Sequence, residues 1–259
     1  MDNGNETGLS NNCIAMTFPS ASISPAANAN HAPITPGQIS RGLDELFAIA
    51  ANQTLDTTCE RFYFLRHGQT PRNALRIYQA PDEPLSALGV EQAHSAASVL
   101  ANEPVAAIVS SNMTRAWQTA GIVAARPELA RHTVISHPGL RERNFGSLNG
   151  TSSANIDWAF SPEGGETLEA FVSRTRLGLG FALTHAAPTL VVAHGGTLYV
   201  LMALLKLELR LHLLGNAQPL LFQRRDGQTG AWRVTPLGNG LSQTGLPAAV
   251  PASAAPNIS

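Results

Sequence analysis

The chain has 259 residues, of which 44% are hydrophobic and 14% charged, the proportions of a globular protein. Seventeen lysine and arginine residues against eighteen acidic residues give a formal net charge of −1. No global positive field therefore draws in nucleic acid or an anionic membrane surface, and we expect neither as a partner. An anionic ligand would have to be bound by a local group of side chains.

The sequence does not show the features of a secreted or membrane-spanning protein. Cys13 and Cys59 are the only cysteines, which excludes a disulfide framework, and their spacing is not that of a thiolate metal site. The first residues, MDNGNETGLSNN, lack the basic region of a secretory signal. The most apolar run, 198–205, is too short to cross a bilayer. We expect a soluble, cytoplasmic protein.

Composition divides the chain into four parts. Residues 1–36, rich in Asn, Ser, Ala, Pro and Gly, are predicted to be a disordered tail. Residues 37–58 are predicted to hold one amphipathic helix and a linker, with the helix docked on the domain or on a partner. Residues 59–237 are predicted to form a single folded domain, and 238–259 a second disordered tail.

Strands and helices alternate within the predicted domain. Apolar runs predict strands at 61–65, 105–110, 132–137 and 189–193, and a closing hairpin made of LLFQRR and WRVTPL. Helical periodicity predicts helices that begin after Ser86, after Ser111 or Asn112, at Glu166 and at Thr197. Such alternation is typical of an α/β layer fold with a mostly parallel sheet.

Ionisable side chains follow three of the predicted strands. The first strand ends in Arg66-His67-Gly68, the second is followed by a helix that carries Arg115, and the strand at 189–193 ends in His194-Gly195-Gly196. Singly, such a residue is more often a surface or capping residue. Because ligands of open α/β sheets bind outside the carboxyl ends of the strands, two arginines and two histidines at that edge predict a binding site.

These residue types are suited to a phosphate group. Two guanidiniums can bind phosphate oxygens through forked hydrogen bonds, and a helix that opens at Gly195-Gly196-Thr197 would add backbone N–H donors. Gly68 and Gly195 lack a Cβ and would let the backbone approach the anion. A neutral imidazole is a competent nucleophile, so the set predicts phosphoryl transfer through a phosphohistidine.

Such a mechanism also needs a proton donor for the leaving alcohol. The turn-rich loop PGLRERNFGSLNG (138–150) carries Glu142, whose alternative role is a loop ion pair with Arg141 or Arg143. Glu166 is a second candidate, although its position is also that of a residue that starts a helix.

A metal site is not supported by the sequence. His67 and His194 lie outside the HExxH and His-x-His patterns, and flanking arginines would repel a cation. The GLG at 178–180 falls inside a helical pattern, so it is not a dinucleotide-binding fingerprint. We expect neither a metal nor another cofactor.

At this point the sequence resembles a known family. LRHGQTPRN (65–73) resembles the LRHGxTxxN signature of the histidine phosphatase superfamily, the branch that includes cofactor-dependent phosphoglycerate mutases. The likeness continues, in the family's order, through PLSALGVEQA, SSNMTRAWQTA, LRERNFGSLNG, GGETLEAF and VVAHGGTL, and covers nearly all of 61–237. It implies a three-layer α/β/α fold with a mostly parallel central sheet and makes 59–237 the catalytic domain.

The resemblance also implies a role for each site residue. His67 would be the phosphorylated nucleophile, and Glu142 the general acid and then the base that activates water. Arg66, Arg115 and His194 would complete the phosphate pocket. Gln69 and Asn73 occupy positions that often line such pockets. Two departures from the family pattern, Met113 for Leu and Ala80 for Gly, are expected to leave the chemistry untouched.

The superfamily contains both mutases and phosphatases. Mutases usually have a longer, charged insertion between the acid and the GGE segment, whereas here SSANIDWAFSPEG is poor in lysine and arginine. The sequence therefore favours a phosphatase that acts on a small-molecule phosphate ester. A mutase-like activity, a catalytically idle module that binds phosphorylated ligands, and a homodimer are left open. Loops 72–84 and 147–164 are expected to set the specificity, but their residues do not name the substrate.

Overall fold

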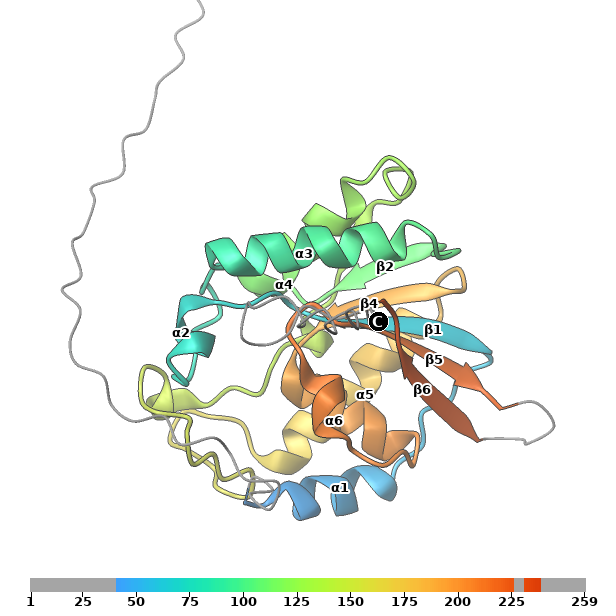
Figure 1. Ribbon diagram of the computed structural model, residues 1–259. Helices are drawn as coiled ribbons and strands as arrows, with labels where there is room; N and C mark the ends of the chain where they lie inside the picture. Colours follow the sequence, from blue (N-terminus) through green and yellow to red (C-terminus); the bar gives the residue numbers. More distant parts are fainter. Residues whose placement is uncertain (1–40, 226–230, 239–259) are drawn as a thin grey trace, which may run out of the picture. The chain divides into compact units, whose positions relative to one another are not determined.

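The structure of the protein is a computed structural model that describes residues 41–225 and 231–238 (Figure 1). The chain divides into the units Met1–Gly37 and Gln38–Ser259, and every described residue belongs to the second. The predicted tail at 1–36, all but the first residue of the predicted tail at 238–259, and the turn at 226–230 lie outside the described residues.

A six-stranded sheet forms the centre of the domain, in the order β3-β2-β4-β1-β5-β6. Its first four strands in sequence are parallel to one another, β5 is antiparallel to β1, and β6 is antiparallel to β5 at the edge of the sheet. The strands are β1 (Arg61–Arg66), β2 (Ala107–Ser110), β3 (Val134–Ser136), β4 (Thr189–Ala193), β5 (Pro219–Arg224) and β6 (Trp232–Pro236). The predicted mostly parallel sheet and its closing hairpin are confirmed.

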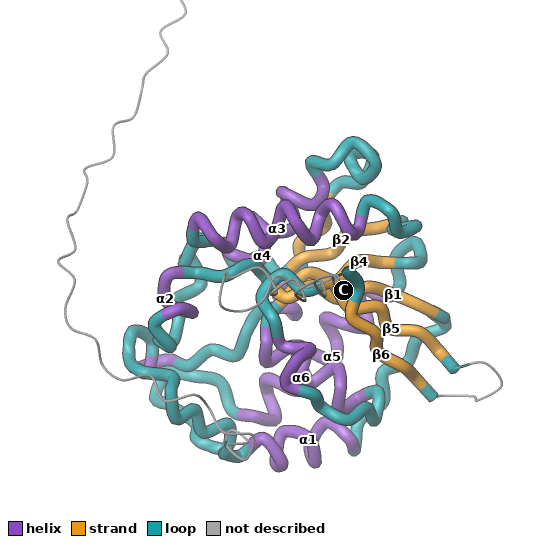
Figure 2. Tube along the Cα trace, viewed as in Figure 1, coloured by secondary structure: helices purple, strands orange, loops and turns teal. Residues whose placement is uncertain are grey.

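Helices cover both faces of this sheet, as the purple and orange layers of Figure 2 show. The described helices are α1 (Leu43–Ala51), α2 (Pro71–Ala74), α3 (Ala87–Leu100), α4 (Thr114–Ala124), α5 (Leu168–Leu183) and α6 (Gly195–Leu204), with short 3-10 turns at Pro138–Leu140, Gly146–Leu148 and Leu211–Leu214. α3 and α4 lie on one face, and α5 and α6 on the other (Figure 1). The three-layer α/β/α fold is therefore confirmed.

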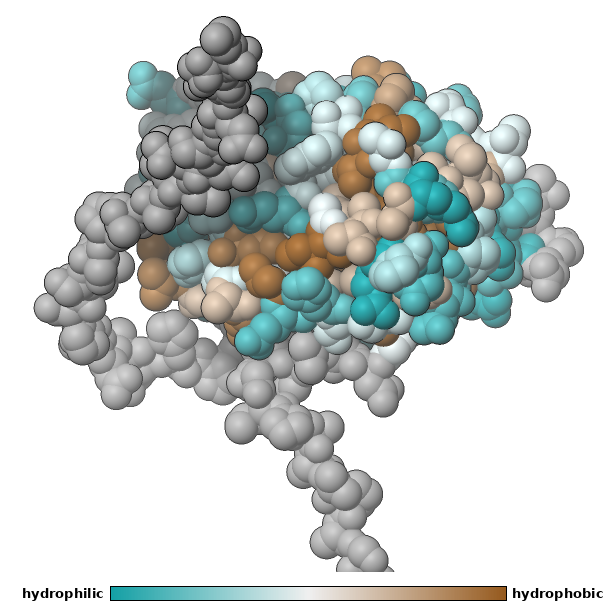
Figure 3. Space-filling view, turned by 90° about the horizontal axis from the view of Figure 1, so that it is seen from above, coloured by the Kyte–Doolittle hydropathy of each residue, from teal (hydrophilic) through white to brown (hydrophobic). Residues whose placement is uncertain are grey.

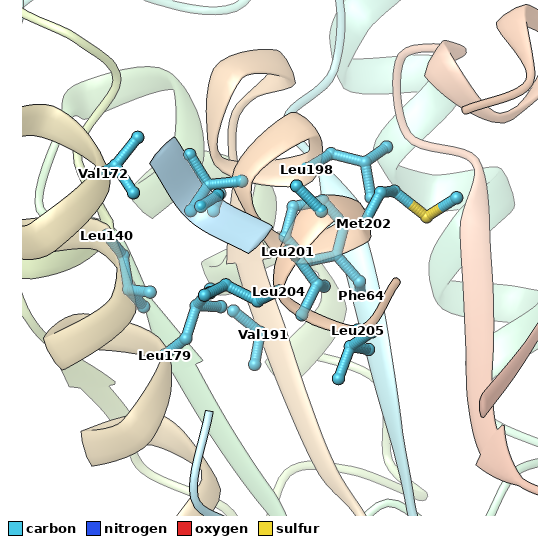
Figure 4. Packing of buried hydrophobic residues seen from close by; sticks show 14 of the residues in the cluster. Phe64, Leu140, Val172, Leu179, Val191, Leu198, Leu201, Met202, Leu204 and Leu205 are labelled. Carbon is cyan, nitrogen blue, oxygen red and sulfur yellow. The ribbon is translucent and has the colours of Figure 1, made fainter. Parts of the chain in front are cut away.

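The central strands are apolar on both sides because both faces are covered. On β1, Phe62 and Phe64 belong to the cluster beneath α5 and α6, while Tyr63 and Leu65 belong to the cluster beneath α3 and α4. Figure 4 shows the first cluster, in which leucines of α6 such as Leu201 pack near Phe64 and Val191. The apolar run that predicted β1 is therefore continuous because its side chains are buried on both faces of the sheet.

The predicted helix near 38–52 is α1, and it packs on the domain itself. Leu43, Leu46 and Ala50 are buried in the cluster shared with α5 and α6. Just before α1, Arg41 lies beside Asp157 and Trp158. The Arg41 carbonyl accepts from the Trp158 N–H at 2.7 Å, and the Arg41 side chain pairs with Asp157. α1 is therefore tied to the loop 147–164.

Several element boundaries differ from the sequence-based expectation. α4 begins at Thr114, and its N-cap is Met113 rather than Ser111 or Asn112. α5 is capped by the Thr167 hydroxyl, which accepts from the Ala170 N–H, rather than started by Glu166. The short α2 was not predicted; Thr70 caps it, and Pro71 supplies the fixed φ of a first helical residue.

None of the described helices is long and apolar enough to cross a membrane. Figure 3 looks onto the face that carries α3 and α4, where apolar side chains lie in small groups among polar ones. The large apolar side chains of α3 and α4 that are exposed are Val90 and Trp117. Isolated apolar side chains of this kind are normal for a protein surface.

The turn after β1 is fitted closely against the start of α3. A Cβ on Gly68 would lie 2.3 Å from the Gly89 carbonyl oxygen, and a Cβ on Gly89 would lie 2.0 Å from that of Gln69. The Gln69 carbonyl also accepts from the Ser86 N–H at 2.9 Å. Two glycines that face each other thus allow the segment after His67 to approach the helix.

We expect Gly89→Ala to lower the free energy of unfolding by about 3 kcal/mol, because backbone atoms on both sides would have to move apart. Gly121→Ala is the matched control: this glycine is also inside a helix, but nothing lies within 4 Å of the added Cβ. The control should be stabilised by about 0.5–1 kcal/mol. Urea unfolding of both variants measures this difference, and equal stabilities would contradict the close contact.

Candidate active site

The parallel register brings the ends of β1, β2 and β4 to one level. Leu65 and Ser110 both pair with Val192 of β4, which lies between the two other strands. The ladder continues one step beyond the strands, because the His67 N–H donates to the Ala193 carbonyl at 3.0 Å and the Ser111 N–H to the Val192 carbonyl at 2.9 Å. His67 and His194 consequently leave the sheet side by side.

The ring of His67 has one nitrogen engaged and one free. Its Nδ1 lies 2.7 Å from the Gly68 carbonyl oxygen, which can only accept, so Nδ1 carries the proton and Nε2 carries the lone pair. Burial, together with the charges of Arg115 and Arg66, lowers the pKa of His67 well below its ordinary value. The imidazole is therefore neutral at neutral pH, with a lone pair on Nε2.

Arg66 and Arg115 bring two positive charges to the same place without a carboxylate partner. Arg66 donates through Nη1 to the Leu214 carbonyl at 2.5 Å, and Arg115 donates through Nη1 to the Ala80 carbonyl at 3.0 Å. Neither forms an ion pair with any described residue, and the Nε of each is buried without a hydrogen-bond partner there. Burial lowers the pKa of both guanidiniums, that of Arg115 to about 10, which leaves Arg115 charged at neutral pH.

The two departures from the family pattern both contact Arg115. The Ala80 carbonyl accepts one of its hydrogen bonds, and the Met113 sulfur lies 3.4 Å from its Nη2. The contact with Ala80 uses a backbone carbonyl, which a glycine would also provide, whereas the contact with Met113 uses the side chain. The expectation that these two departures leave the chemistry untouched stays a prediction.

His194 lies beside His67, with ring centroids 5.2 Å apart. It is fully buried, and its Nε2 lies 2.8 Å from the Ser111 hydroxyl. Its Nδ1 is buried and has no hydrogen-bond partner among the described residues. Burial, Arg115, His67, Arg66 and Arg174 all lower the pKa of His194, so that it too is neutral at neutral pH.

The Glu142 carboxylate is held by backbone N–H groups. Its Oε1 accepts from the Arg143 N–H, and its Oε2 accepts from the Gly196 N–H at the start of α6, both at 3.0 Å. The carboxylate is close enough to Arg66 and Arg115 to oppose the fall in their pKa values. Gly196 is required here because a Cβ at this position would lie 2.1 Å from Oε1.

The alternative role of Glu142, an ion pair with a neighbouring arginine, is wrong for the described residues. Arg141 instead donates to the Asn112 side chain at 2.6 Å, and the buried Arg143 donates to the carbonyls of Trp158, Phe160 and Glu166. Arg143 thus joins three loop segments around the carboxylate and leaves Glu142 facing the site.

The second candidate acid, Glu166, is occupied by a structural ion pair. Arg174 of α5 donates to its two oxygens at 2.7 and 2.8 Å. The same guanidinium donates to the carbonyls of Gly139 and Arg141 at 3.0 and 3.1 Å. Glu166 therefore supports the loop that carries Glu142, through Arg174, and does not reach the site itself.

The remaining predicted residues lie near the site but are engaged in other contacts. The Gly68 N–H donates to the Thr119 hydroxyl at 3.1 Å, and its missing Cβ makes room for α3. The predicted role of Gly68 in the approach of an anion stays a prediction. The Gln69 N–H donates to the Gln92 side chain. Asn73 closes the capping box of α2. A Cβ on Gly195 would lie 3.7 Å from Arg66 Nε, so this position faces the guanidinium.

Some residues of the site were missed from the sequence. Tyr199 of α6 is close enough to Arg66 and Glu142 for their charges to affect the pKa of its phenol, which burial raises. The buried Trp158 lies against Tyr199 and against Gly196. Tyr199 follows the HGG segment within one helical turn, which is the one signal that could have indicated it. Trp158 is distant in sequence from every motif residue that it contacts.

No group of three metal-binding side chains occurs in the part of the chain that the structure describes. The two histidines at the sheet edge are accompanied by two guanidiniums and by one carboxylate, that of Glu142. This donor set fits an anion and not a cation.

Comparison with known proteins gives the same family as the motifs. A profile of the histidine phosphatase superfamily (branch 1) matches residues 62–219. A protein of Proteus mirabilis (strain HI4320) named "Probable phosphoglycerate mutase GpmB" is 34% identical over 159 residues, which cover 54% of this chain and 72% of that protein. Its namesake from Yersinia pestis (strain Pestoides F) is 34% identical over 166 residues, with coverages of 55% and 73%.

Solved structures show the same architecture. A mycobacterial glucosyl-3-phosphoglycerate phosphatase, solved in complex with VO3, is 29% identical and superimposes with a TM-score of 0.55, over 68% of this chain and 97% of that one. A structure described as a putative α-ribazole-5′-P phosphatase of Escherichia coli, 22% identical, shares the fold with a TM-score of 0.59 over 70% of this chain and 97% of that one. The described fold, the motifs and the profile agree: this chain belongs to the histidine phosphatase superfamily, branch 1.

Proposed function

We propose that the protein is a phosphomonoesterase that hydrolyses a small-molecule phosphate ester through a phosphohistidine on His67. One observation carries this proposal: the Nε atoms of Arg66 and Arg115 and the Nδ1 of His194 are buried without partners among the described residues, around a neutral histidine. Leaving buried donors unpaired costs about 1–3 kcal/mol each, and a phosphoryl group would satisfy them together. Because the donors are fixed before an anion arrives, they need no reorganisation.

In the first step, the lone pair on His67 Nε2 attacks phosphorus, and the bond from phosphorus to the ester oxygen breaks. The Nδ1–H···O contact with the Gly68 carbonyl fixes the ring so that Nε2 is the attacking atom. The guanidiniums stabilise the equatorial oxygens, and a protonated Glu142 gives its proton to the leaving alcohol.

In the second step, water attacks the phosphohistidine, and the Glu142 carboxylate takes the proton that the water loses. Inorganic phosphate leaves, and His67 and Glu142 return to their starting states. The two backbone N–H groups that bind Glu142 hold the carboxylate in one place for both proton transfers.

Hydrolysis rather than transfer to a second substrate is favoured by the segment that follows Glu142. Between 143 and 164 it contains Arg143 as its only arginine and no lysine, and Arg143 is buried and bound to backbone carbonyls. No basic side chain of this segment is therefore free to retain the departing phosphorylated intermediate. The glucosyl-3-phosphoglycerate phosphatase among the structural neighbours supports the same choice.

The second candidate function is a phosphoglycerate mutase-like activity, which the names of the curated relatives favour. A non-catalytic module that binds phosphorylated ligands is a weaker alternative. Such a module needs a pocket but no nucleophile and no acid, yet His67 and Glu142 are both held by specific hydrogen bonds.

We expect His67→Ala to reduce the hydrolysis of p-nitrophenyl phosphate by at least about 10³-fold while the fold is retained, because the variant lacks the imidazole that attacks phosphorus in the proposed mechanism. His94→Ala, which removes an exposed histidine of α3, is the control and should keep wild-type activity. Continuous release of p-nitrophenol and circular dichroism measure both properties. A folded His67→Ala protein with undiminished turnover would refute the nucleophile.

Glu142→Gln should lower kcat/KM on the order of 10²-fold for alkyl phosphates and much less for p-nitrophenyl phosphate, whose leaving group needs no proton. Gly196→Ala should show the same pattern, because its methyl group displaces the carboxylate. Gly180→Ala, where a Cβ meets nothing within 4 Å, is the control. Equal losses on both classes of ester would contradict the role of Glu142 as the acid.

Assays with 3-phosphoglycerate distinguish the phosphatase from the mutase. In a screen of phosphate esters, we expect the protein to release inorganic phosphate whether or not 2,3-bisphosphoglycerate is added. We expect little conversion of 3-phosphoglycerate to 2-phosphoglycerate. Conversion that depends on the bisphosphate and exceeds phosphate release would replace the proposal with the mutase. The screen should begin with glucosyl-3-phosphoglycerate, the substrate named for the structural neighbour.

Three further expectations are part of the proposal. The enzyme is proposed to act without a metal, so chelation should leave its activity intact. A cytoplasmic location fits a small phosphate ester as substrate. A homodimer stays a prediction that no contact described above tests.

A further inference from the structure

Ser111 occupies a central position between two phosphate-binding side chains. It is fully buried directly after β2, and its hydroxyl oxygen lies 2.8 Å from His194 Nε2. The same oxygen accepts from the Met113 N–H at 3.2 Å, and Met113 is the N-cap of α4, which carries Arg115 in its first turn. One hydroxyl thus joins the end of β4 to the start of α4.

Counting donors and acceptors shows which way the hydrogen bond to His194 runs. The Met113 N–H already donates to the Ser111 oxygen, so the hydroxyl proton still needs an acceptor. Among the described residues, His194 Nε2 is the acceptor within hydrogen-bond distance. A buried hydroxyl keeps its proton paired, so Ser111 donates and Nε2 accepts.

The direction of this bond fixes the proton on the other ring nitrogen. A neutral imidazole has one N–H, and if Nε2 accepts, the proton is on Nδ1. Nδ1 is buried and has no partner among the described residues. In the opposite tautomer Nδ1 would present a lone pair to the phosphoryl oxygens and would repel them.

In the resting protein, protonation of the whole His194 ring does not supply the N–H at Nδ1. The groups that face His194 are Arg66 and His67 from β1, Arg115 from α4 and Arg174 from α5, and together with burial they lower its pKa well below the ordinary value. The ring must therefore donate as a neutral tautomer.

We propose that Ser111 is a positioning residue that holds His194 in its Nδ1–H tautomer, so that a neutral histidine donates a hydrogen bond to the phosphoryl group. The inference rests on the phosphohistidine mechanism proposed above, but the tautomer belongs to the resting protein and can be measured without turnover. By closing the turn before α4, the same hydroxyl also sets the start of the helix that carries Arg115.

Three variants separate the hydroxyl from the space that it fills. Ser111→Ala should lower kcat/KM for p-nitrophenyl phosphate on the order of 10- to 100-fold, as expected for the loss of a group that orients an active-site ligand. Ser111→Thr keeps the hydroxyl and should stay close to wild type. Ser110→Ala is the control, because Ser110 is equally buried but donates to the Ser111 carbonyl and not to a histidine.

Two measurements would not respond to a merely structural role of Ser111: the pH dependence of the activity, and the protonation state of each imidazole nitrogen of His194. A protonated His194 has an N–H at Nδ1 in every variant, so the deficit of Ser111→Ala should shrink as the pH falls. In the protein labelled with ¹⁵N-histidine, wild-type His194 should show a protonated Nδ1 and a bare Nε2, and addition of vanadate should shift the Nδ1–H signal. Ser111→Ala should show the other tautomer or a mixture.

Each contrary result overturns the inference. A resting wild-type spectrum with His194 protonated on Nε2 does so whatever the activity, and it decides the matter even if Ser111→Ala fails to fold. An unimpaired Ser111→Ala enzyme, or a Ser110→Ala enzyme equally impaired, also overturns it. Vanadate that binds without changing the Nδ1–H signal does the same. A protein with the expected tautomer that hydrolyses no ester would refute the proposed function and not the tautomer.

Discussion

The site depends on two guanidiniums held at a sheet edge without a carboxylate partner among the described residues. Removing a charge from water is costly unless it is paired, so a buried Arg115 and a half-buried Arg66 with open Nε donors are unfavourable for the empty protein. Carbonyls of Ala80 and Leu214 satisfy only part of each guanidinium. The remaining donors favour the binding of an anion. Burial, together with the same two charges, lowers the pKa of both histidines and keeps them neutral.

A carboxylate close to these arginines would be expected to pair with them and fill the pocket. The structure prevents this by engaging Glu142 from its other side, through the N–H groups of Arg143 and Gly196. Arg143 then ties the loop that carries Glu142 to carbonyls of residues 158–166, and Arg174, which is paired with Glu166, binds carbonyls of the loop itself. The basic residues of this region consequently act as scaffold, while Glu142 forms no ion pair with a described residue.

The sequence was sufficient for the features that depend on local pattern and strand order. Apolar runs located the strands, and because ends of parallel strands meet at one edge, Arg66, His67, Arg115 and His194 could be brought together without coordinates. It was insufficient for contacts between distant segments. Nothing near Gly196 signals that its missing Cβ makes room for Glu142, and nothing near Ala80 signals Arg115. Ser111 was considered as a helix cap, and its bond to His194 spans 83 positions.

The two loops expected to set specificity are not independent of each other. The Tyr78 N–H and carbonyl bond to Thr151 and Gly150, and the Ser153 N–H donates to the Arg76 carbonyl, so loops 72–84 and 147–164 share a short ladder of backbone hydrogen bonds. Ala80 of the first loop binds Arg115, and Trp158 of the second lies against Gly196 and is bound by Arg41 before α1. The two loops are therefore coupled to each other and, through Ala80 and Trp158, to the side chains of the proposed site. We propose that substrate choice is a property of the paired loops together with α1, and that the sheet edge binds the phosphoryl group.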